Sequence, residues 1–257
     1  MGVFFRAEHL VMRFGGLAAV NDFSITLHPG ELVGLIGPNG AGKTTVFNMI
    51  TGAILATAGR IIWQGENITH LPLHAITARG IARTFQNIRL FSDLTALDNV
   101  MVSFHHKLRA HLWDAMLGLP AYRREEHRMR EESLEILQEI GLAHLALEKA
   151  GALPYGRQRR LEIARALATR PKLLLLDEPA AGMNPQETME LVELLRDLRD
   201  KYSLTILLIE HDMKFVMRLC ERIKVLDYGN SIAEGTPREI QSNPDVIKAY
   251  LGSQRHA

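Results

Sequence analysis

The sequence is poor in cysteine and in long apolar runs. Its one cysteine among 257 residues is Cys220, so no disulfide can form within the chain, which fits a reducing compartment. Cys220 stands in an apolar stretch with helical spacing and is predicted to be buried packing. No apolar run approaches the roughly 18 residues that a membrane-spanning helix needs. We therefore do not expect this chain to cross a bilayer itself.

An excess of either charge is also missing. Lys and Arg together number 30 and Asp and Glu 29, which gives a formal net charge of +1. The composition therefore gives no support for a nucleic acid or an acidic substrate as the main partner, and we expect no nucleic-acid partner. The apolar start of the chain is interrupted at once by Arg6 and Glu8, so we see no signal-peptide core and expect a cytoplasmic protein.

What the sequence does contain is a segment that fits the phosphate-binding pattern G-x-x-x-x-G-K-[ST]. It follows a short apolar run at residues 32–36 and precedes helical spacing at residues 44–50, which is the strand-loop-helix context that such a loop needs. The segment consists of Gly37, Pro38, Asn39, Gly40, Ala41, Gly42, Lys43, Thr44 and Thr45. The alternative is a glycine turn before an ordinary helix, but the context favours nucleotide binding.

Each part of this loop has a physical task. Its glycines let successive backbone N–H groups point at phosphate oxygens, and the following helix adds the positive end of its dipole. Lys43 would place a charge between the terminal phosphates, and the Thr44 hydroxyl would bind Mg²⁺.

The order of the other elements predicts an α/β fold. Strands are predicted at residues 4–9, 23–27, 59–63, 173–176 and 204–209. The last two are continuous apolar runs separated by a helix at 187–201, an alternation that is typical of a buried parallel sheet. A hairpin is predicted within residues 223–233.

A long helical pattern with many charges interrupts these strands at residues 95–150 and marks a second subdomain. We expect an ATP-binding core subdomain from residues 1–87 and 171–257, and a helical subdomain from residues 88–170.

Two carboxylates, Asp177 and Glu178, directly follow the apolar run at residues 173–176. They should therefore lie at the carboxyl edge of a buried strand, where ligands of parallel sheets bind. Asp177 could hold the Mg²⁺ that Thr44 also contacts, and Glu178 could accept a proton from a water that attacks the γ-phosphate. The alternative is a pair of solvated acids at the end of a strand.

The segment Leu-Pro-Tyr-Gly-Arg-Gln-Arg-Arg at residues 153–160 runs into a predicted helix at 161–168. Together with Gln86, the acidic pair and His211, in this order and at this spacing, it resembles the ATP-binding subunit of an ABC transporter. The resemblance covers essentially the whole chain. It implies the ABC ATPase fold, a P-loop NTPase sheet with an N-terminal antiparallel β subdomain and an inserted α-helical subdomain, and the cofactors ATP and Mg²⁺.

The resemblance also implies roles for single residues. Gln86 would contact the metal or the attacking water, and His211 would hold the γ-phosphate and orient Glu178. Phe14 would stack on adenine, although the family more often uses tyrosine there, and Asn184 would stand in a loop that crosses to a partner subunit. Plainer interpretations are a surface amide for Gln86, a core aromatic for Phe14 and a turn former for Asn184.

The segment around Tyr155 and Gly156 would be the family's signature, which faces the ATP held by a second subunit. It departs from the usual Leu-Ser-Gly-Gly-Gln at Pro154, Tyr155 and Arg157, and the missing serine hydroxyl removes one expected phosphate contact. We therefore expect two unequal ATP sites in a heterodimer with a related subunit, with a homodimer as the alternative.

Several further stretches narrow the resemblance to the ATP-binding subunit of the bacterial branched-chain (hydrophobic) amino acid uptake system. They are residues 13–20, 83–86, 178–185, 210–213 and 243–252. This resemblance implies integral membrane permease subunits and, indirectly, a periplasmic amino-acid-binding protein as partners, at the cytoplasmic face of the inner membrane. The alternatives are a urea or amide importer, the ATPase of lipopolysaccharide export, and a soluble ABC ATPase outside transport.

Overall fold

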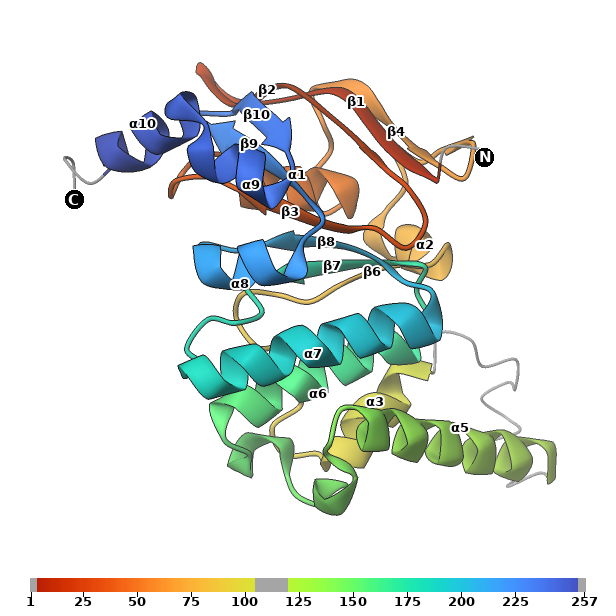
Figure 1. The fold of residues 1–257 in the computed structure, drawn as a ribbon. Helices are drawn as coiled ribbons and strands as arrows, with labels where there is room; N and C mark the ends of the chain where they lie inside the picture. The colour runs from red at the N-terminus through yellow and green to blue at the C-terminus, as the bar shows by residue number, and fades with distance from the viewer. Residues whose placement is uncertain (1–3, 105–119, 254–257) are drawn as a thin grey trace. The chain divides into compact units, whose positions relative to one another are not determined.

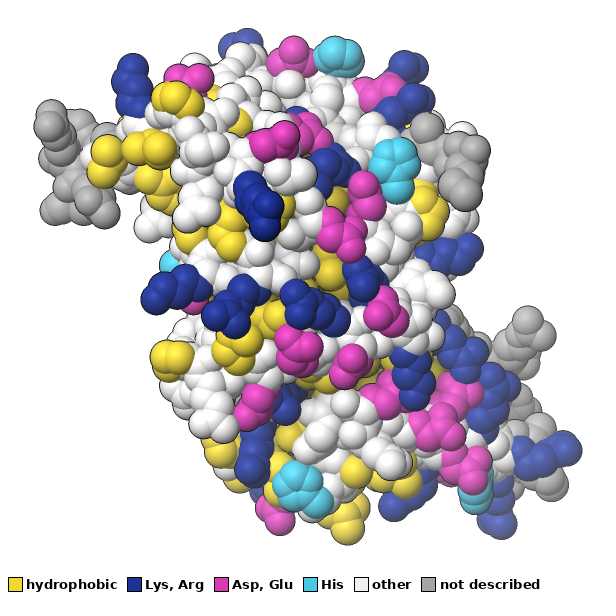
Figure 2. All heavy atoms as spheres, in the orientation of Figure 1, with side chains coloured by type: hydrophobic (Ala, Val, Ile, Leu, Met, Phe, Trp, Pro, Cys, Tyr) yellow, Lys and Arg dark blue, Asp and Glu magenta, His cyan; other side chains and the backbone are white. Residues whose placement is uncertain are grey.

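The computed structural model describes residues 4–104 and 120–253 (Figure 1). The chain forms two compact units, of which the first comprises residues 1–83 and 172–257 and the second residues 84–171. Basic and acidic side chains are interspersed on the face shown in Figure 2, as the nearly balanced composition leads one to expect. No helix of the described residues is long and apolar enough to span a bilayer.

The first unit contains a six-stranded sheet in the order β10-β9-β3-β8-β7-β6. The strands are β3 (Leu32–Ile36), β6 (Ile81–Arg83), β7 (Leu173–Asp177), β8 (Thr205–Ile209), β9 (Arg222–Asp227) and β10 (Asn230–Gly235). Neighbours from β9 to β6 pair in parallel, and β10 is an antiparallel edge strand. Every residue of β3, β7 and β8 is buried, which explains their continuous apolar sequences. The predicted parallel sheet and hairpin are confirmed.

The same unit contains an antiparallel sheet in the order β2-β1-β4-β5. Its strands are β1 (Phe5–Phe14), β2 (Leu17–Leu27), β4 (Ala58–Trp63) and β5 (Glu66–Asn67). The first two are longer than the predicted segments 4–9 and 23–27. Their pairing shifts register after Ala7 and again after Leu10, and such bulges interrupt the alternation on which the sequence prediction relied.

Helices of the first unit fix the position of the phosphate loop. They are α1 (Lys43–Ile50), α2 (Leu73–Ala78), α7 (Pro185–Tyr202), α8 (Met213–Leu219), α9 (Pro237–Ser242) and α10 (Pro244–Ser253). Phe47 of α1 belongs to one core cluster with Phe5 and Phe23 of the antiparallel sheet and Leu35 of β3. In Figure 1, α1 accordingly lies between this sheet and β3. The beginning of α1 is therefore held by packing on both sides.

Two local predictions need correction in this unit. Cys220 is buried as expected, but it follows α8 in an extended conformation and is not part of a helix. Helix α7 begins at Pro185 and not near Glu187, because Asn184 caps it and proline suits the first turn of a helix.

The second unit is helical. Its described helices are α3 (Ala96–Phe104), α5 (Pro120–Glu139) and α6 (Tyr155–Ala168), with short 3₁₀ turns at Ala143–Leu145 and Ala150–Ala152. The continuous helical pattern expected up to residue 150 is wrong beyond Glu139, because Gly141 adopts a left-handed φ of 75° that ends α5. Helix α6 begins at Tyr155, six residues before the start of the helix predicted at residues 161–168.

Candidate nucleotide-binding site

The phosphate loop joins β3 to α1 and is shaped by close backbone approaches. A Cβ atom on Gly37 would lie 2.0 Å from the Leu226 carbonyl oxygen, and one on Gly42 would lie 2.5 Å from the Ala19 carbonyl oxygen. Gly42 precedes α1 at a φ of 101° and caps it without a side-chain hydrogen bond. The first N–H groups of α1 therefore have no side-chain cap, which is the arrangement that suits an anion.

Lys43 is a buried cation that folds back on its own loop. Its Nζ donates to the carbonyl oxygens of Gly37 at 2.7 Å and Pro38 at 2.9 Å. Burial lowers the pKa of Lys43, while the charges of Glu178 and Asp177 act in the opposite direction. Because both carboxylates influence this ammonium group, the loop and the edge of β7 form one charged site.

Asp177 is the last residue of β7 and is almost completely buried. Its Oδ2 accepts a hydrogen bond from Nη2 of Arg83 at 2.6 Å, and Nη1 of Arg83 donates to Oδ1 of Asn48 at 2.7 Å. Arg83 therefore ties Asp177 to α1, the helix that carries Lys43. The interpretation of Asp177 as a solvated acid is wrong.

Glu178 is held just beyond the end of the strand. Its N–H donates to the Ile209 carbonyl oxygen at 2.9 Å, and its φ of 48° is left-handed, which is costly for a residue other than glycine. Its side chain is 20% exposed, and Oε1 lies 3.9 Å from Nδ1 of His211. The more exposed His211 and the partly buried carboxylate thus face one another at the edge of the sheet.

Glu210, which precedes His211, is a buried carboxylate that organises this edge. It accepts hydrogen bonds from the N–H groups of Ala180 at 2.8 Å, His211 at 3.1 Å and Asp212 at 3.4 Å. Burial raises the pKa of Glu210, and the three N–H groups partly oppose that shift. Glu210 thereby joins the loop after Glu178 to the segment of His211.

The remaining predicted residues of this unit occupy distinct positions. Thr44 is an exposed residue in the first turn of α1. Phe14, at the end of β1, is 52% exposed and is not a core aromatic. Asn184 is the N-cap of α7 and accepts hydrogen bonds from the N–H groups of Gln186 and Glu187. It therefore stabilises the start of α7, whether or not its loop also contacts a partner subunit.

Gln86, Tyr155 and Gly156 belong to the second unit, where a buried arginine connects their segments. Nη1 of Arg159 donates to the Phe85 carbonyl oxygen at 2.7 Å, and Nη2 donates to the Gln86 carbonyl oxygen and, at 2.8 Å, to the Tyr155 hydroxyl. Its guanidinium lies 5.3 Å from the centre of the Tyr155 ring. The exposed Gln86 segment and the start of α6 are therefore tied to each other within this unit.

A second buried charge completes this network. Oε2 of Glu162 lies 3.3 Å from Nη1 of Arg159, and Oε1 accepts from the Phe85 N–H at 3.2 Å. Burial raises the pKa of Glu162, and Arg159 opposes that rise.

The structure thus brings Lys43, Asp177, Glu178 and His211 to one edge of the first unit. Sequence reasoning missed the roles of Arg83 and Glu210, which hold this edge of the first unit, and of Arg159 and Glu162, which connect the segments of Gln86 and Tyr155 within the second unit. Arg83 carried a signal, because it ends a strand and its neighbour β7 ends at Asp177. The others sit in helices or beside His211, where a single charged residue has no distinctive pattern.

The donor set near the phosphate loop suits a hard cation. Among the described residues no group of three or more His, Cys, Asp and Glu could hold a metal alone. A hydroxyl at Thr44 and a buried carboxylate at Asp177 provide oxygen ligands, and Mg²⁺ commonly completes such a set with water and substrate phosphates. The residues therefore fit Mg²⁺ bound together with a nucleotide.

Comparisons with known protein families agree with a nucleotide-binding site at this position. The model of the ABC transporter family matches residues 20–181, and one described as "Branched-chain amino acid ATP-binding cassette transporter" matches residues 232–256. The chain is 50% identical over 243 residues to the high-affinity branched-chain amino acid transport ATP-binding proteins BraF of Pseudomonas aeruginosa and LivG of Escherichia coli, with 95% of each chain covered. The lipopolysaccharide export system ATP-binding protein LptB of Escherichia coli is 38% identical, with 96% of each chain covered.

Solved structures agree. The ADP conformation of an ATP-binding cassette of an ABC transporter superposes with a TM-score of 0.86 at 32% identity, covering 98% of this chain and 100% of the other. A dimeric cassette in a post-hydrolysis state, bound to ADP and phosphate, superposes with a TM-score of 0.77 at 26% identity, covering 91% of this chain and 99% of the other.

Proposed function

This chain belongs to the ABC transporter family as an ATP-hydrolysing subunit, and we propose that it energises an importer of branched-chain amino acids. The proposed substrate class rests on the 50% identity, over 95% of the chain, to the ATP-binding proteins of two such systems. The lipopolysaccharide export relative is less similar, at 38% identity. The match of residues 232–256 also favours amino acid transport over that export system, over a urea or amide importer and over a soluble ABC ATPase.

The site geometry supports a division of labour in hydrolysis. The amides at the start of α1 and Lys43 bind the phosphates, and Phe14 stacks on the adenine from the end of β1. Glu178 accepts a proton from the water that attacks the γ-phosphate, and His211, 3.9 Å away, orients that carboxylate and contacts the phosphate. As the family resemblance implies, Gln86 would contact the metal or that water.

Mg²⁺ would be held by the Thr44 hydroxyl, the Asp177 carboxylate and Gln86. When bound it would neutralise charge on the phosphate oxygens during transfer. Arg83 fixes the orientation of the Asp177 carboxylate for this purpose, because it forms a buried ion pair with Oδ2 and is itself anchored to Asn48.

The signature segment supports the proposal that two ATP-binding subunits act together. Helix α6 begins at Tyr155 with no side-chain cap, so that Gly156 and the first N–H groups can meet the γ-phosphate held by another subunit. Pro154 supplies neither a hydroxyl nor an N–H. We therefore propose a heterodimer with a related ATP-binding subunit in which the site completed by this signature is the weaker one.

The chain would act at the cytoplasmic face of the inner membrane, attached to integral permease subunits. The ATP-binding core subdomain predicted at residues 1–87 and 171–257 would correspond to the first unit, residues 1–83 and 172–257. The helical subdomain predicted at residues 88–170 would correspond to the second unit, residues 84–171, and would dock on the permease. A periplasmic amino-acid-binding protein would deliver the substrate to the complex.

The test is reconstitution of this chain with the membrane and ATP-binding subunits that co-purify with it. Proteoliposomes should accumulate leucine, isoleucine or valine only with ATP and the cognate periplasmic binding protein. The Glu178→Gln complex serves as the matched control that assembles without turnover. Uptake of urea or an amide, or export of lipopolysaccharide, with no amino acid uptake would refute the proposed substrate class.

A further inference from the structure

Strands β7 and β8 end side by side, so the residues that follow them leave the sheet at the same place. Asp177 pairs with Ile209 in the parallel ladder, and Glu178 and Glu210 are the next residues along the two segments. The two carboxylates differ in burial, because the Glu178 side chain is 20% exposed and the Glu210 side chain only 1%. Glu178 is thus accessible to a ligand, whereas Glu210 is enclosed by protein.

The Glu210 carboxylate bridges the two segments that carry Glu178 and His211. Its Oε1 accepts a hydrogen bond from the N–H of Ala180, two residues after Glu178, at 2.8 Å. Its Oε2 accepts from the N–H groups of His211 at 3.1 Å and Asp212 at 3.4 Å. Each carboxylate oxygen therefore holds a different segment, and both oxygens are needed to keep the two segments together.

The backbone at Glu178 needs such support. Its φ of 48° is left-handed, which costs free energy in a residue other than glycine. The Glu178 N–H donates to the Ile209 carbonyl oxygen, and this is one attachment of the turn to the end of β8. The bond from the Ala180 N–H to Glu210 is a second attachment, so the turn that presents the Glu178 side chain is held at two points.

The imidazole of His211 lies at the same distance from both carboxylates. Its Nδ1 is 3.9 Å from Oε1 of Glu178 and 3.9 Å from Oε2 of Glu210. The His211 side chain is 59% exposed, so surrounding side chains do not enclose it. The separation between His211 and Glu178 therefore depends on the backbone of the two segments, which Glu210 joins.

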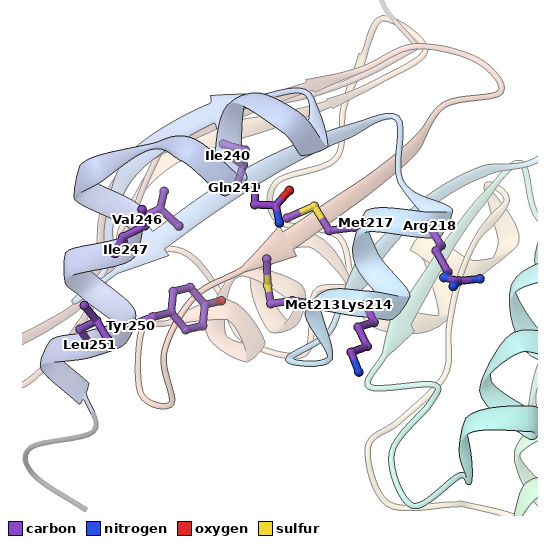
Figure 3. Close-up of a pocket in the computed structure, with 10 residues that line it drawn as sticks. All are labelled: Met213, Lys214, Met217, Arg218, Ile240, Gln241, Val246, Ile247, Tyr250 and Leu251. Atoms are coloured by element: carbon purple, nitrogen blue, oxygen red, sulfur yellow. The ribbon is translucent and has the colours of Figure 1, made fainter.

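Helix α8, which follows this segment, does not enclose it from the other side. Met213 and Met217 of α8 border an apolar pocket of about 570 Å³ between α8 and the C-terminal helices (Figure 3). A residue beside such a space is not confined by neighbours on every side. The position of His211 is therefore left to the hydrogen bonds of Glu210 and to Asp212, which caps α8.

We propose that Glu210 is a positioning residue for ATP hydrolysis, whose carboxylate holds Glu178 and His211 at the separation that the reaction requires. It is buried and acts through the backbone N–H groups of Ala180 and His211. This inference rests on the proposed roles of Glu178 and His211 in the ATPase site. Loss of the Glu210 carboxylate should lower the rate of the chemical step and leave nucleotide binding by the phosphate loop intact.

The test is Glu210→Gln in the assembled transporter. An amide accepts through its oxygen alone, and its NH₂ group would then face N–H donors on the other side, so one of the two links must break. The kcat for ATP hydrolysis should fall about 10- to 100-fold, because misplacement of a reacting group by ~1 Å can cost about 10²-fold. The KM for ATP should stay within about twofold, as should the ATP dissociation constant of the single chain.

Glu210→Asp breaks the bridge in a second way. An aspartate can still accept from the N–H two residues on, at Asp212, but its side chain is one methylene too short to reach the Ala180 N–H as well. The kcat should therefore fall as in the glutamine variant. Wild-type kcat in either folded variant, or failure of both variants to fold, would show that Glu210 serves the fold alone and would overturn the proposal.

A double variant tests whether Glu210 acts through Glu178. In a Glu178→Gln background the base is already missing, so Glu210→Gln should lower kcat much less than it does in the wild-type background. A loss of the same size in both backgrounds would mean that Glu210 acts independently of Glu178, against the proposal.

Two matched controls separate the bridge from general effects of charge and packing. Glu221→Gln removes a carboxylate charge from an exposed position of the same unit, and Met217→Ala removes apolar atoms from the side of α8 that borders the pocket (Figure 3). Neither should change kcat. A fall in Met217→Ala equal to that in Glu210→Gln would show that any loosening of α8 has this effect, and the specific role of Glu210 would be refuted.

The Glu178→Gln variant also distinguishes this proposal from the proposed function. If Glu178→Gln loses hydrolysis and the Glu210 variants keep it, Glu178 is the base and only the role of Glu210 is refuted. If Glu178→Gln keeps wild-type hydrolysis, the proposed roles of both residues are refuted.

Discussion

The phosphate loop and the signature segment each place a glycine at the start of a helix, but the buried cations of the two regions have different surroundings. At α1, Lys43 lies in the first turn and is surrounded by carbonyl oxygens and by the carboxylates of β7 and its following loop. At α6, the buried cation Arg159 is turned inward onto Phe85 and Gln86, and Tyr155 and Gly156 are left at the surface. The first region is a charged site in its own unit, whereas the second is a rigid surface that a ligand held elsewhere can meet.

Together with the proposed heterodimer, this difference predicts that one chain binds nucleotide and that two chains are needed to hydrolyse it efficiently. Variants in the first region should change binding or chemistry directly. Variants in the second should leave nucleotide binding by the folded single chain intact and change the ATPase rate only in the assembled complex.

Glu178→Gln should have the largest effect. Loss of a positioned base should lower kcat for ATP hydrolysis by about 10²- to 10⁴-fold, while ATP binding remains because the phosphate loop is unchanged. Steady-state turnover of the assembled complex and equilibrium binding measure the two. Glu193→Gln on the exposed side of α7 is the matched control. Hydrolysis near the wild-type rate would rule out Glu178 as the base.

Arg159→Met should destabilise the second unit by about 3–5 kcal/mol, because it leaves the buried Glu162 carboxylate without its partner. Urea unfolding measures the loss, Arg130→Met on the exposed face of α5 is the control, and the double variant with Glu162→Gln should recover most of it.

The pH dependence of the Arg159→Met effect follows from Glu162. Burial raises the folded-state pKa of Glu162 above its ordinary value of 4.5. Ionisation of this carboxyl therefore lowers the free energy of unfolding as the pH rises from 4.5 through the raised pKa. The destabilisation should therefore shrink as the pH falls towards 4.5. A pH-independent loss, or no recovery in the double variant, would show that the ion pair is not what holds the start of α6.

Lys43→Ala should weaken ATP binding about 10- to 100-fold, because each charged hydrogen bond to phosphate contributes roughly 1.5–3 kcal/mol. Equilibrium binding to the single chain is the measurement. Lys248→Ala is a matched control, because this exposed cation borders the same loop from α10. Equal weakening in both variants would indicate a general charge effect and not a specific contact of Lys43.

The sequence predicted those features of the two regions that lie in one continuous segment. The phosphate loop and the acidic pair are continuous segments next to apolar strands, so the fold class and the edge that carries Asp177 could be predicted and the fold is confirmed. Arg83 holds Asp177 across 94 residues of sequence, and Arg159 reaches Phe85 across 74. Such contacts exist only once the chain is folded. The roles of Gln86, His211 and Phe14 came from the family resemblance and stay predictions.

The smallest expected effect is in the signature segment, where Pro154→Ser would restore a hydroxyl and an N–H before α6. The Pro154 carbonyl oxygen already accepts from the N–H groups of Arg157 and Gln158, and Gln158 also donates to the Leu153 carbonyl oxygen. The start of α6 is therefore well ordered, and serine should add one phosphate contact without reshaping it. We expect ATP binding by the single chain to be unchanged and the ATPase rate of the reconstituted heterodimer to rise a few-fold. This gain is smaller than the one that a full charged hydrogen bond, which contributes roughly 1.5–3 kcal/mol, would give.

Pro154→Ala is the matched control for that gain, since it restores the backbone donor without the hydroxyl. A gain in serine but not in alanine would assign the difference between the two ATP sites to the hydroxyl. A gain in both would assign it to the backbone N–H that proline lacks. If neither variant raises the ATPase rate or ATP-driven closure of the dimer, the exposed N–H groups at Tyr155 and Gly156 already suffice, and the proposed inequality of the two sites is wrong.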